Sequence, residues 1–107
     1  MIEINVIKLK NYASVCSVLY VEDDDNLRAS TAELLKNFFN SIDIAEDGTI
    51  GLEKYKSKKY DLVITDIMMP EMDGFEVCRR IRQVSSVPIM MLTALNSEEE
   101  IIGGLDS

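Results

Sequence analysis

The stretch Val-Leu-Tyr-Val-Glu-Asp-Asp, Val18–Asp24, places three acidic residues directly after a short apolar run, and Leu-Val-Ile-Thr-Asp, Leu62–Asp66, ends a second apolar run on another acid. Continuous apolar runs of this length are typical of strands buried on both faces of a parallel sheet. Ligand-binding groups gather outside the carboxyl ends of such strands, so both acidic clusters should open onto one crevice. Because clustered carboxylates repel one another and carboxylate oxygens suit Mg²⁺, the two runs predict a small Mg²⁺ site that meets a phosphoryl group.

The residues after the first acidic turn predict a helix, a strand and a second helix. The first helix has apolar residues at helical spacing, with Asp25 and Asn26 available as caps: Leu27, Leu34, Leu35, Phe38 and Phe39. We interpret its charged residues, including Arg28 and Glu33, as solvent-facing. Ile42–Ala45 predicts the second strand. The next helix contains Ile50, Leu52 and Tyr55, and we interpret its lysines as a solvated basic end: Lys54, Lys56, Lys58 and Lys59.

Asp61–Asp66 predicts the third strand, which leads into a loop bracketed by Pro70 and Gly74. A helix follows, with one apolar face made of Phe75, Val77, Cys78 and Ile81. Ile89–Leu92 predicts a fourth buried strand, and Ser97 with Glu100 has the form of a capping box at the start of a last helix. Repeated strand and helix alternation predicts a doubly wound α/β fold, a parallel sheet with helices on both faces.

Composition limits the function classes. A chain of 107 residues holds one domain, and 11 basic against 19 acidic residues give a formal net charge of −8, which disfavours direct binding of nucleic acid. The N-terminal residues contain no signal peptide and no membrane span, so we expect a cytoplasmic protein with no membrane contact. Cys16 and Cys78 have no metal-ligand spacing, and we expect both to be reduced core thiols.

Residues 1–17 form an extension before the first strand, and residues 18–107 form the domain itself. Apolar residues of the extension fit a short amphipathic helix: Ile4, Ile7, Leu9 and Tyr12. Alternation at Ile2, Ile4 and Val6 also permits a strand. The sequence leaves both structures open.

From about Val18 onward the chain resembles the receiver domain of bacterial two-component response regulators. The resemblance is carried by three motifs in order: Val-Leu-Tyr-Val-Glu-Asp-Asp, Asp-Leu-Val-Ile-Thr-Asp-Ile-Met-Met-Pro-Glu-Met-Asp-Gly and Pro-Ile-Met-Met-Leu-Thr-Ala. It implies a flavodoxin-like doubly wound sheet whose last strand and helix are missing from this chain. It also implies a phosphoprotein that functions in phosphorelay signal transduction.

The resemblance implies a role for each residue that matches a family motif. Asp66 matches the phosphoacceptor, the aspartate that becomes an aspartyl phosphate. Glu22 and Asp23 match the acidic pair that organises Mg²⁺, with Asp23 as a direct ligand and Glu22 acting through water. Met68 matches the position whose backbone carbonyl binds the metal, and Thr93 matches the switch hydroxyl that contacts a phosphoryl oxygen.

The family also carries a lysine at the end of a fifth strand, and this sequence stops at Leu105-Asp106-Ser107 before that strand could start. We favour a fragment of a longer regulator as the explanation. The alternative is a truncated receiver that completes its open sheet edge through another chain, for example as a homodimer.

These residues predict a module that accepts a phosphoryl group on Asp66 from a sensor histidine kinase, with Mg²⁺, and changes its conformation toward an unknown downstream effector. It is not an enzyme for external substrates, although it catalyses its own phosphorylation and dephosphorylation. A phosphatase with an aspartyl nucleophile would need a second aspartate where Met68 stands. A phosphorylation-independent interaction module, or an inactive fragment, is the alternative.

Overall fold

The computed structural model describes residues 15–92. In that range strands and helices alternate, in the order β1 Ser17–Val21, α2 Asp25–Leu35, β2 Ser41–Ala45, α3 Gly48–Ser57, β3 Leu62–Asp66, α4 Gly74–Arg82 and β4 Ile89–Leu92. The strands form one sheet in the order β2-β1-β3-β4, and every pairing is parallel. The predicted strands are confirmed to within one residue at their ends. The helix predicted from Ser97 and the N-terminal helix or strand lie outside the described residues.

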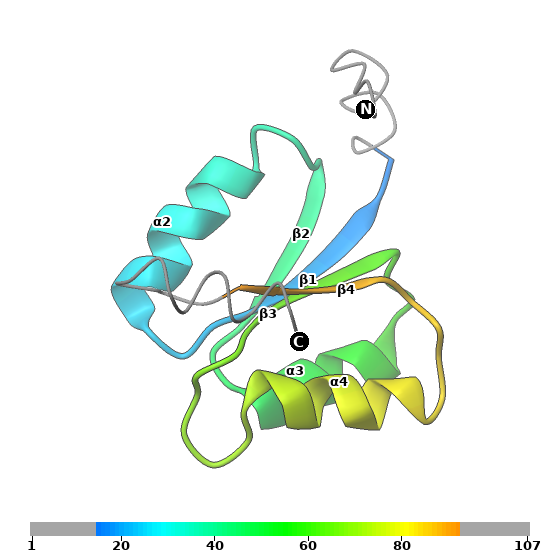
Figure 1. Cartoon of the computed structure of the whole chain (residues 1–107). Coiled ribbons are helices and arrows are strands. Elements are labelled where there is room, and N and C mark those ends of the chain that lie inside the picture. The colour runs from blue at the N-terminus through cyan, green and yellow to red at the C-terminus, as the bar shows by residue number, and fades with distance from the viewer. Residues whose placement is uncertain (1–14, 93–107) are drawn as a thin grey trace, which may run out of the picture.

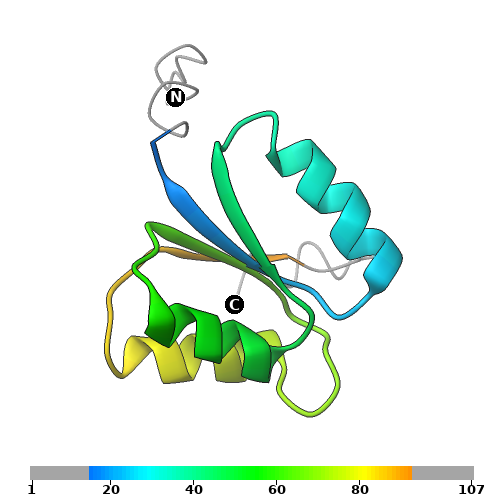
Figure 2. The same cartoon turned by 180° about the vertical axis from the view of Figure 1, so that it is seen from behind.

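The helices lie on both faces of the sheet. Figure 1 shows α2 on one side and α3 with α4 together on the other, and the rear view in Figure 2 shows the same two layers. Each helix carries the chain back to the edge of the sheet where the strands begin, so all strands end at the opposite edge. The carboxyl ends of β1 and β3, which are neighbours in the sheet, therefore lie side by side.

The two helical layers bury the two faces of β1 separately. Leu19 and Val21 belong to the core on the side of α3 and α4, whereas Val18 and Tyr20 pack on the α2 side. None of these four side chains is more than 2% exposed. The prediction of a strand buried on both faces is confirmed for β1. Within residues 15–92, no helix combines the length and apolar character that crossing a membrane requires.

An aspartate precedes each helix of residues 15–92 and caps its amino end. The side chains of Asp24, Asp47 and Asp73 accept hydrogen bonds from the backbone N–H three residues later, at 2.9, 2.8 and 2.9 Å. These bonds satisfy amide groups that have no partner inside the helix. Asp25 and Asn26, predicted as caps of α2, instead lie inside its first turn. That prediction was wrong by one residue, because β1 ends at Val21 and the turn that follows is short.

The apolar face of α2 is narrower than predicted. Leu35 and Phe39 pack against the sheet, but Leu34 is 60% exposed and Phe38 45% exposed. The fourth strand was predicted to be buried, and on the α2 side it is not, since Met90 is 51% exposed. The physical reason is that α2 contacts β2, residues at its end pack on β1 and β3, and the β4 part of that face has no helix over it in the described range.

One prediction about the other layer needs correction. Val77 and Ile81 of α4 are buried and Cys78 is half-buried, but Phe75 is exposed, because it lies on the outer side of the first helical turn. The lysines at the end of α3 are solvent-accessible, as interpreted, and two of them also make polar contacts. Lys54 Nζ donates to the carbonyl of Ile44, and Lys58 Nζ lies 3.0 Å from the Asp43 carboxylate. Cys16 is buried, as expected for a core thiol.

Candidate functional site

Three carboxylates meet at the carboxyl ends of β1 and β3. Glu22 and Asp23 follow β1 directly, and Asp66 is the last residue of β3. One oxygen from each lies within 4.8 Å of the others. Glu22 is 2% exposed and Asp66 6% exposed, whereas Asp23 is half-buried and accessible from outside. The structure brings these three predicted residues together, as their place after neighbouring parallel strands led us to expect.

The electrostatics of this cluster favour a cation. Burial first, and then the neighbouring Asp23 and Asp66, raise the pKa of Glu22 to about 7 against the lowering effect of a backbone hydrogen bond from Asp24. A carboxyl group with this pKa is only partly ionised at neutral pH, and a positive ion nearby would favour the ionised form. Closely spaced oxygen donors with two buried carboxylates suit a hard divalent cation such as Mg²⁺. The donor set therefore fits the predicted metal.

Backbone and side-chain hydrogen bonds hold the acidic turn in place. The N–H of Asp24 donates to Glu22 Oε2 at 3.1 Å. Arg28 Nη1 donates to the carbonyl of Glu22 at 2.9 Å and to that of Asp23 at 3.5 Å. The Arg28 side chain is 15% exposed, so the prediction that it faces solvent was wrong. The reason is that the first turn of α2 folds Arg28 back over the turn that precedes the helix.

Arg28 and Asp24 are the site residues that the sequence did not assign. A usable signal for Arg28 existed, because it follows Asp25 by three residues and the two pair across one helical turn at 2.5 Å. Asp24 could have been recognised as the first of several polar residues able to cap α2. Arg28 supports the acidic turn from α2, and Asp24 supports it from within, through its N–H bond to Glu22.

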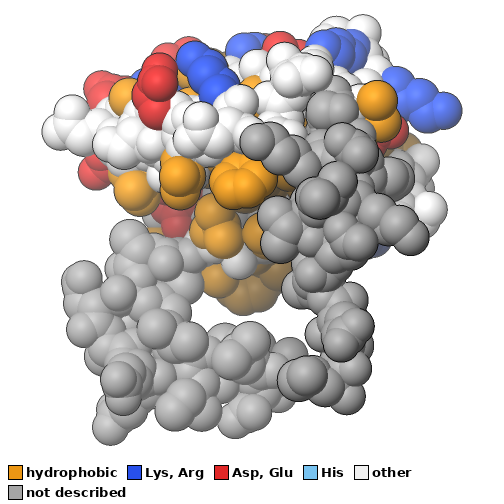
Figure 3. All heavy atoms as spheres, turned by 90° about the horizontal axis from the view of Figure 1, so that it is seen from above, with side chains coloured by type: hydrophobic (Ala, Val, Ile, Leu, Met, Phe, Trp, Pro, Cys, Tyr) orange, Lys and Arg blue, Asp and Glu red, His pale blue; other side chains and the backbone are white. Residues whose placement is uncertain are grey.

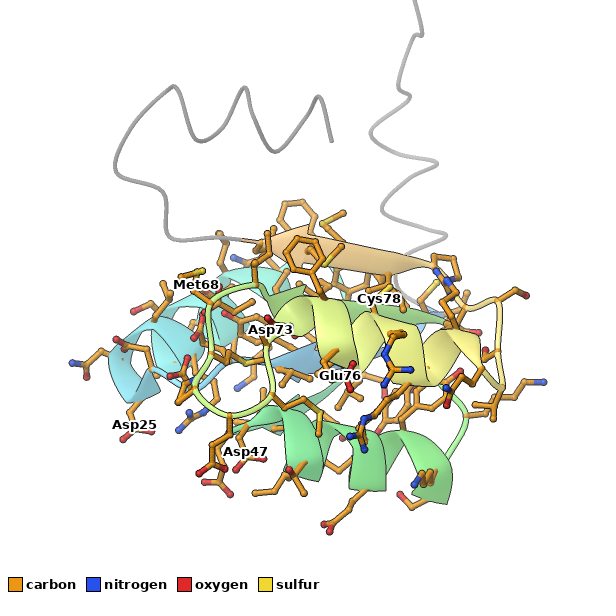
Figure 4. The ribbon with its side chains drawn as sticks, turned by 60° about the horizontal axis from the view of Figure 1, so that its bottom comes forward. Asp25, Asp47, Met68, Asp73, Glu76 and Cys78 are labelled. Carbon is orange, nitrogen blue, oxygen red and sulfur yellow. The ribbon has the colours of Figure 1, made fainter. Side chains whose placement is uncertain are left out.

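The loop after β3 supports Asp66. The N–H of Met68 lies 3.4 Å from Asp66 Oδ1, and the N–H of Ile67 donates to the carbonyl of Leu92 at 2.9 Å. The Met68 side chain is 75% exposed, and Figure 4 shows it pointing away from the molecule on this loop. Its thioether therefore has no role inside the site, which leaves the backbone of residue 68 as the group that faces Asp66. Thr93, the predicted switch hydroxyl, lies outside the described residues.

Gly74 brings the start of α4 against the end of β3. Its N–H donates to the carbonyl of Ile67 at 2.9 Å, and a β-carbon at this position would stand 2.3 Å from the carbonyl oxygen of Asp66. Gly74 was predicted to shape the loop around Met68. The structure places its closest approach at the backbone of Asp66 itself.

Comparisons with known proteins agree with this geometry. Residues 18–107 match the model of the response regulator receiver domain family. Response regulator ArlR of Staphylococcus epidermidis is 41% identical over 90 residues, which cover 84% of this chain and 41% of that protein. Transcriptional regulatory protein AfsQ1 of Streptomyces coelicolor is 40% identical over 91 residues, 85% of this chain and 40% of that protein. The chain thus spans about two fifths of the length of these curated relatives.

Solved structures share the fold of this chain. Chemotaxis response regulator CheY4 of Vibrio cholerae is 32% identical with a TM-score of 0.70, and the match covers 85% of this chain and 78% of that one. Response regulator TrrA of Thermotoga maritima, solved in complex with Mg(2+)-BeF, is 35% identical with a TM-score of 0.69, and the match covers 87% of this chain and 82% of that one.

Proposed function

The chain belongs to the family of response regulator receiver domains of two-component systems, and from that premise we propose that Asp66 is its phosphoacceptor. This membership confirms the family and the fold class predicted from the sequence. The observation that carries the proposal is the convergence of Asp66 with Glu22 and Asp23 at one edge of the sheet. A nucleophile for phosphoryl transfer needs nearby positive charge, and these carboxylates are the groups that would hold it.

The surroundings of Asp66 support this proposal. It is 6% exposed, and its Oδ1 faces the N–H of Met68 at 3.4 Å, so the orientation of the carboxylate is constrained. In the proposed reaction an oxygen of Asp66 forms a bond to phosphorus while the bond from phosphorus to a histidine nitrogen breaks. The bonding electrons return to that imidazole nitrogen, which takes a proton from water. The product is an aspartyl phosphate, which water later hydrolyses.

We propose that Mg²⁺ assists this step. Asp23, Asp66 and the backbone carbonyl of Met68 would hold the ion directly, and Glu22 would act through a bound water. When bound, the ion neutralises charge on the phosphoryl oxygens and on the carboxylates. The similarity to TrrA, which was solved with Mg(2+)-BeF, supports this proposal. Thr93 follows β4 directly in the sequence, and we propose it as the hydroxyl that contacts the phosphoryl group.

We propose a sensor histidine kinase as the phosphodonor and a cytoplasmic location for the exchange. Relatives of this chain include proteins named transcriptional regulatory proteins, which favours a downstream effector that acts in transcription. The receiver itself, with a formal net charge of −8, would signal through a protein contact and not through DNA.

Phosphoryl uptake tests the proposal. The chain is incubated with Mg²⁺ and phosphoramidate, which carries the same phosphorus–nitrogen bond as phosphohistidine, and its intact mass is recorded. Asp66→Asn is compared with Asp61→Asn, a matched change at the exposed opposite end of β3, where Asp61 accepts from the N–H of Ser17 at 2.9 Å. We expect one phosphoryl group on the unmodified chain and on Asp61→Asn, and none on Asp66→Asn.

The same assay separates the alternatives. A version extended with the family's fifth strand and lysine is tested beside the chain of 107 residues. Uptake only by the extended version would identify the shorter chain as an inactive fragment. Absence of uptake in both would contradict the proposal and favour a phosphorylation-independent interaction module.

A further inference from the structure

β2 lies at one edge of the sheet, with β1 on one side and no described strand on the other. Figure 2 shows β2 in front of β1, and any continuation of the sheet beyond β4 leaves this edge unchanged. Peptide groups along a strand point alternately to its two sides. The carbonyl of Ala45 accepts from the N–H of Glu22 at 3.0 Å, on the β1 side, so the N–H and carbonyl of Ile44 point to the free edge. Groups of this kind are a template on which another strand can add.

The side chains at this edge favour such an addition. Ile42 and Ile44 lie on the α2 face of β2, beside Val18 and Tyr20 in the register. Ile42 packs against the core on that face, whereas Ile44 is 41% exposed. A strand added beside β2 would therefore cover apolar surface as well as backbone groups.

Lys54 occupies the acceptor that an added strand would need. Its ammonium donates from α3 to the carbonyl of Ile44, ten residues earlier in the sequence. Lys54 is half-buried, whereas Lys56 on the same helix is exposed. Lys58 brings a second charge to this edge, 3.0 Å from the carboxylate of Asp43. Figure 3, a view from above, shows acidic and basic side chains interspersed along the upper border of the molecule, which is the β2 side of the sheet.

We infer that Lys54 prevents this chain from pairing with a second copy of itself through β2. A second copy fits this edge because a twofold axis beside β2 lets the same groups serve both chains. The pairing is antiparallel, with Ile44 of one copy opposite Ile44 of the other, so that the two residues exchange both backbone hydrogen bonds. The exposed isoleucine side chains then cover one another.

The ammonium of Lys54 stands in the way of this pair. It must leave the carbonyl of Ile44 before the N–H of the second copy can donate there. A hydrogen bond from a charged donor is stronger than the bond between backbone groups that would replace it. The edge therefore stays closed while Lys54 is in place.

Sedimentation velocity over a range of protein concentrations tests this inference. We expect Lys54→Met to strengthen self-association about tenfold relative to the unmodified chain, the factor that corresponds to losing one charge-assisted hydrogen bond. Lys54→Arg keeps a charged donor, and Lys56→Met removes an equal charge from an exposed position, so neither should change self-association. An unchanged association constant in Lys54→Met, or an equal increase in Lys56→Met, would overturn the inference.

A cysteine at position 44 locates the contact. Ile44→Cys is made in a Cys78→Ser background, with and without Lys54→Met, and the thiols are oxidised. We expect a disulfide-linked dimer to form about tenfold faster without Lys54, because α-carbons of opposite residues lie within the ~4.4–6.8 Å that a disulfide spans.

Ile42→Cys is the matched control for this crosslink, since it lies on the same face of β2 but opposite residue 46 of the second copy. It should form little disulfide-linked dimer. Equal crosslinking at positions 42 and 44, or crosslinking at position 44 that ignores Lys54, would contradict the proposed pairing. Both tests use the unphosphorylated chain, so the proposal for Asp66 stands or falls separately.

Discussion

Gly74 stands so close to Asp66 that a β-carbon on residue 74 would lie 2.3 Å from the Asp66 carbonyl oxygen and 2.9 Å from the α-carbon of Ile67. No heavy atoms approach so closely without displacement, and here the neighbour is backbone and cannot rotate away. The end of β3 and the start of α4 therefore share one position that only glycine fills. Through this contact the loop that carries Met68 is fixed relative to the proposed phosphoacceptor.

Gly74→Ala should accordingly impair the site. We expect a destabilisation of about 2 kcal/mol, measured by urea denaturation, together with a slower phosphoryl uptake, because the new methyl group displaces the backbone of Asp66. Ile81→Val is the control, because Ile81 is buried in the core on the α3 and α4 side, and this change costs about 1 kcal/mol without touching the backbone of Asp66. Equal slowing of uptake in both variants would show that the effect is one of general stability.

Arg28→Met should weaken the binding of Mg²⁺. Arg28 donates to the carbonyls of Glu22 and Asp23, and loss of such supporting groups typically lowers metal affinity about 10-fold to 100-fold. Isothermal titration with Mg²⁺ measures the change. Lys36→Met is the matched control, because Lys36 is 61% exposed and its nearest acid, Glu33, lies 3.7 Å away. Unchanged affinity in Arg28→Met would remove Arg28 from the account of the site.

Asp24→Ala should destabilise the protein by about 1 kcal/mol, the usual cost of removing a helix cap. The Asp24 carboxylate accepts from the N–H of Leu27 at 2.9 Å, and alanine leaves that amide without a partner. Asn26→Ala, at a position that the sequence also offered as a cap, should change the free energy of unfolding far less. A larger loss in Asn26→Ala would contradict the capping assigned to Asp24.

Tyr60→Phe should alter how stability depends on pH. The Tyr60 hydroxyl donates to Asp43 Oδ2 at 2.6 Å. This bond is the main cause that holds the pKa of Asp43 below its ordinary value of 3.8, and the contact with Lys58 is the second. A carboxyl whose pKa is lower in the folded than in the unfolded protein stabilises the fold at pH values above the unfolded pKa. That contribution is lost as the pH falls through the folded-state pKa. We expect Tyr60→Phe to lower the free energy of unfolding by about 1 kcal/mol near pH 7 and by less at pH 3. The loss is small because the carboxylate is partly exposed.

The control for this prediction is Tyr55→Phe. The Tyr55 ring stacks on that of Tyr60 with centroids 6.2 Å apart, so the change removes a neighbouring hydroxyl from the same cluster. Stability curves measured by urea denaturation from pH 3 to pH 7 should coincide in shape for Tyr55→Phe and the unmodified chain. A difference between Tyr60→Phe and the unmodified chain that stays constant with pH would contradict the role given to Asp43.

The sequence predicted the sheet and the acidic cluster because both depend on local pattern. β1, β3 and β4 contain apolar runs, β2 alternates apolar and polar residues, and Asp66 is the last residue of β3. Parallel pairing then brings Asp66 to Glu22 and Asp23 with no further information. The same reasoning identified β4 as Ile89–Leu92 without error at either end.

Exposure and side-chain contacts could not be predicted in the same way, since they depend on which elements lie over a surface. Met90 looks like a core residue in the sequence, yet α2 does not reach it. Arg28 looks like a surface residue, yet the end of β1 turns two carbonyls toward it. The choice among Asp24, Asp25 and Asn26 as the cap depends on the length of one turn, which composition does not specify.

Borohydride reduction of the phosphorylated chain tests the central claim, that Asp66 is the phosphoacceptor, most directly. An aspartyl phosphate is reduced by borohydride to homoserine, whereas an unmodified aspartate is not, so peptide mass spectrometry after treatment with Mg²⁺, phosphoramidate and borohydride locates the acceptor. The account predicts homoserine at position 66 and nowhere else. Homoserine at position 23, or at any other aspartate in place of Asp66, would contradict it.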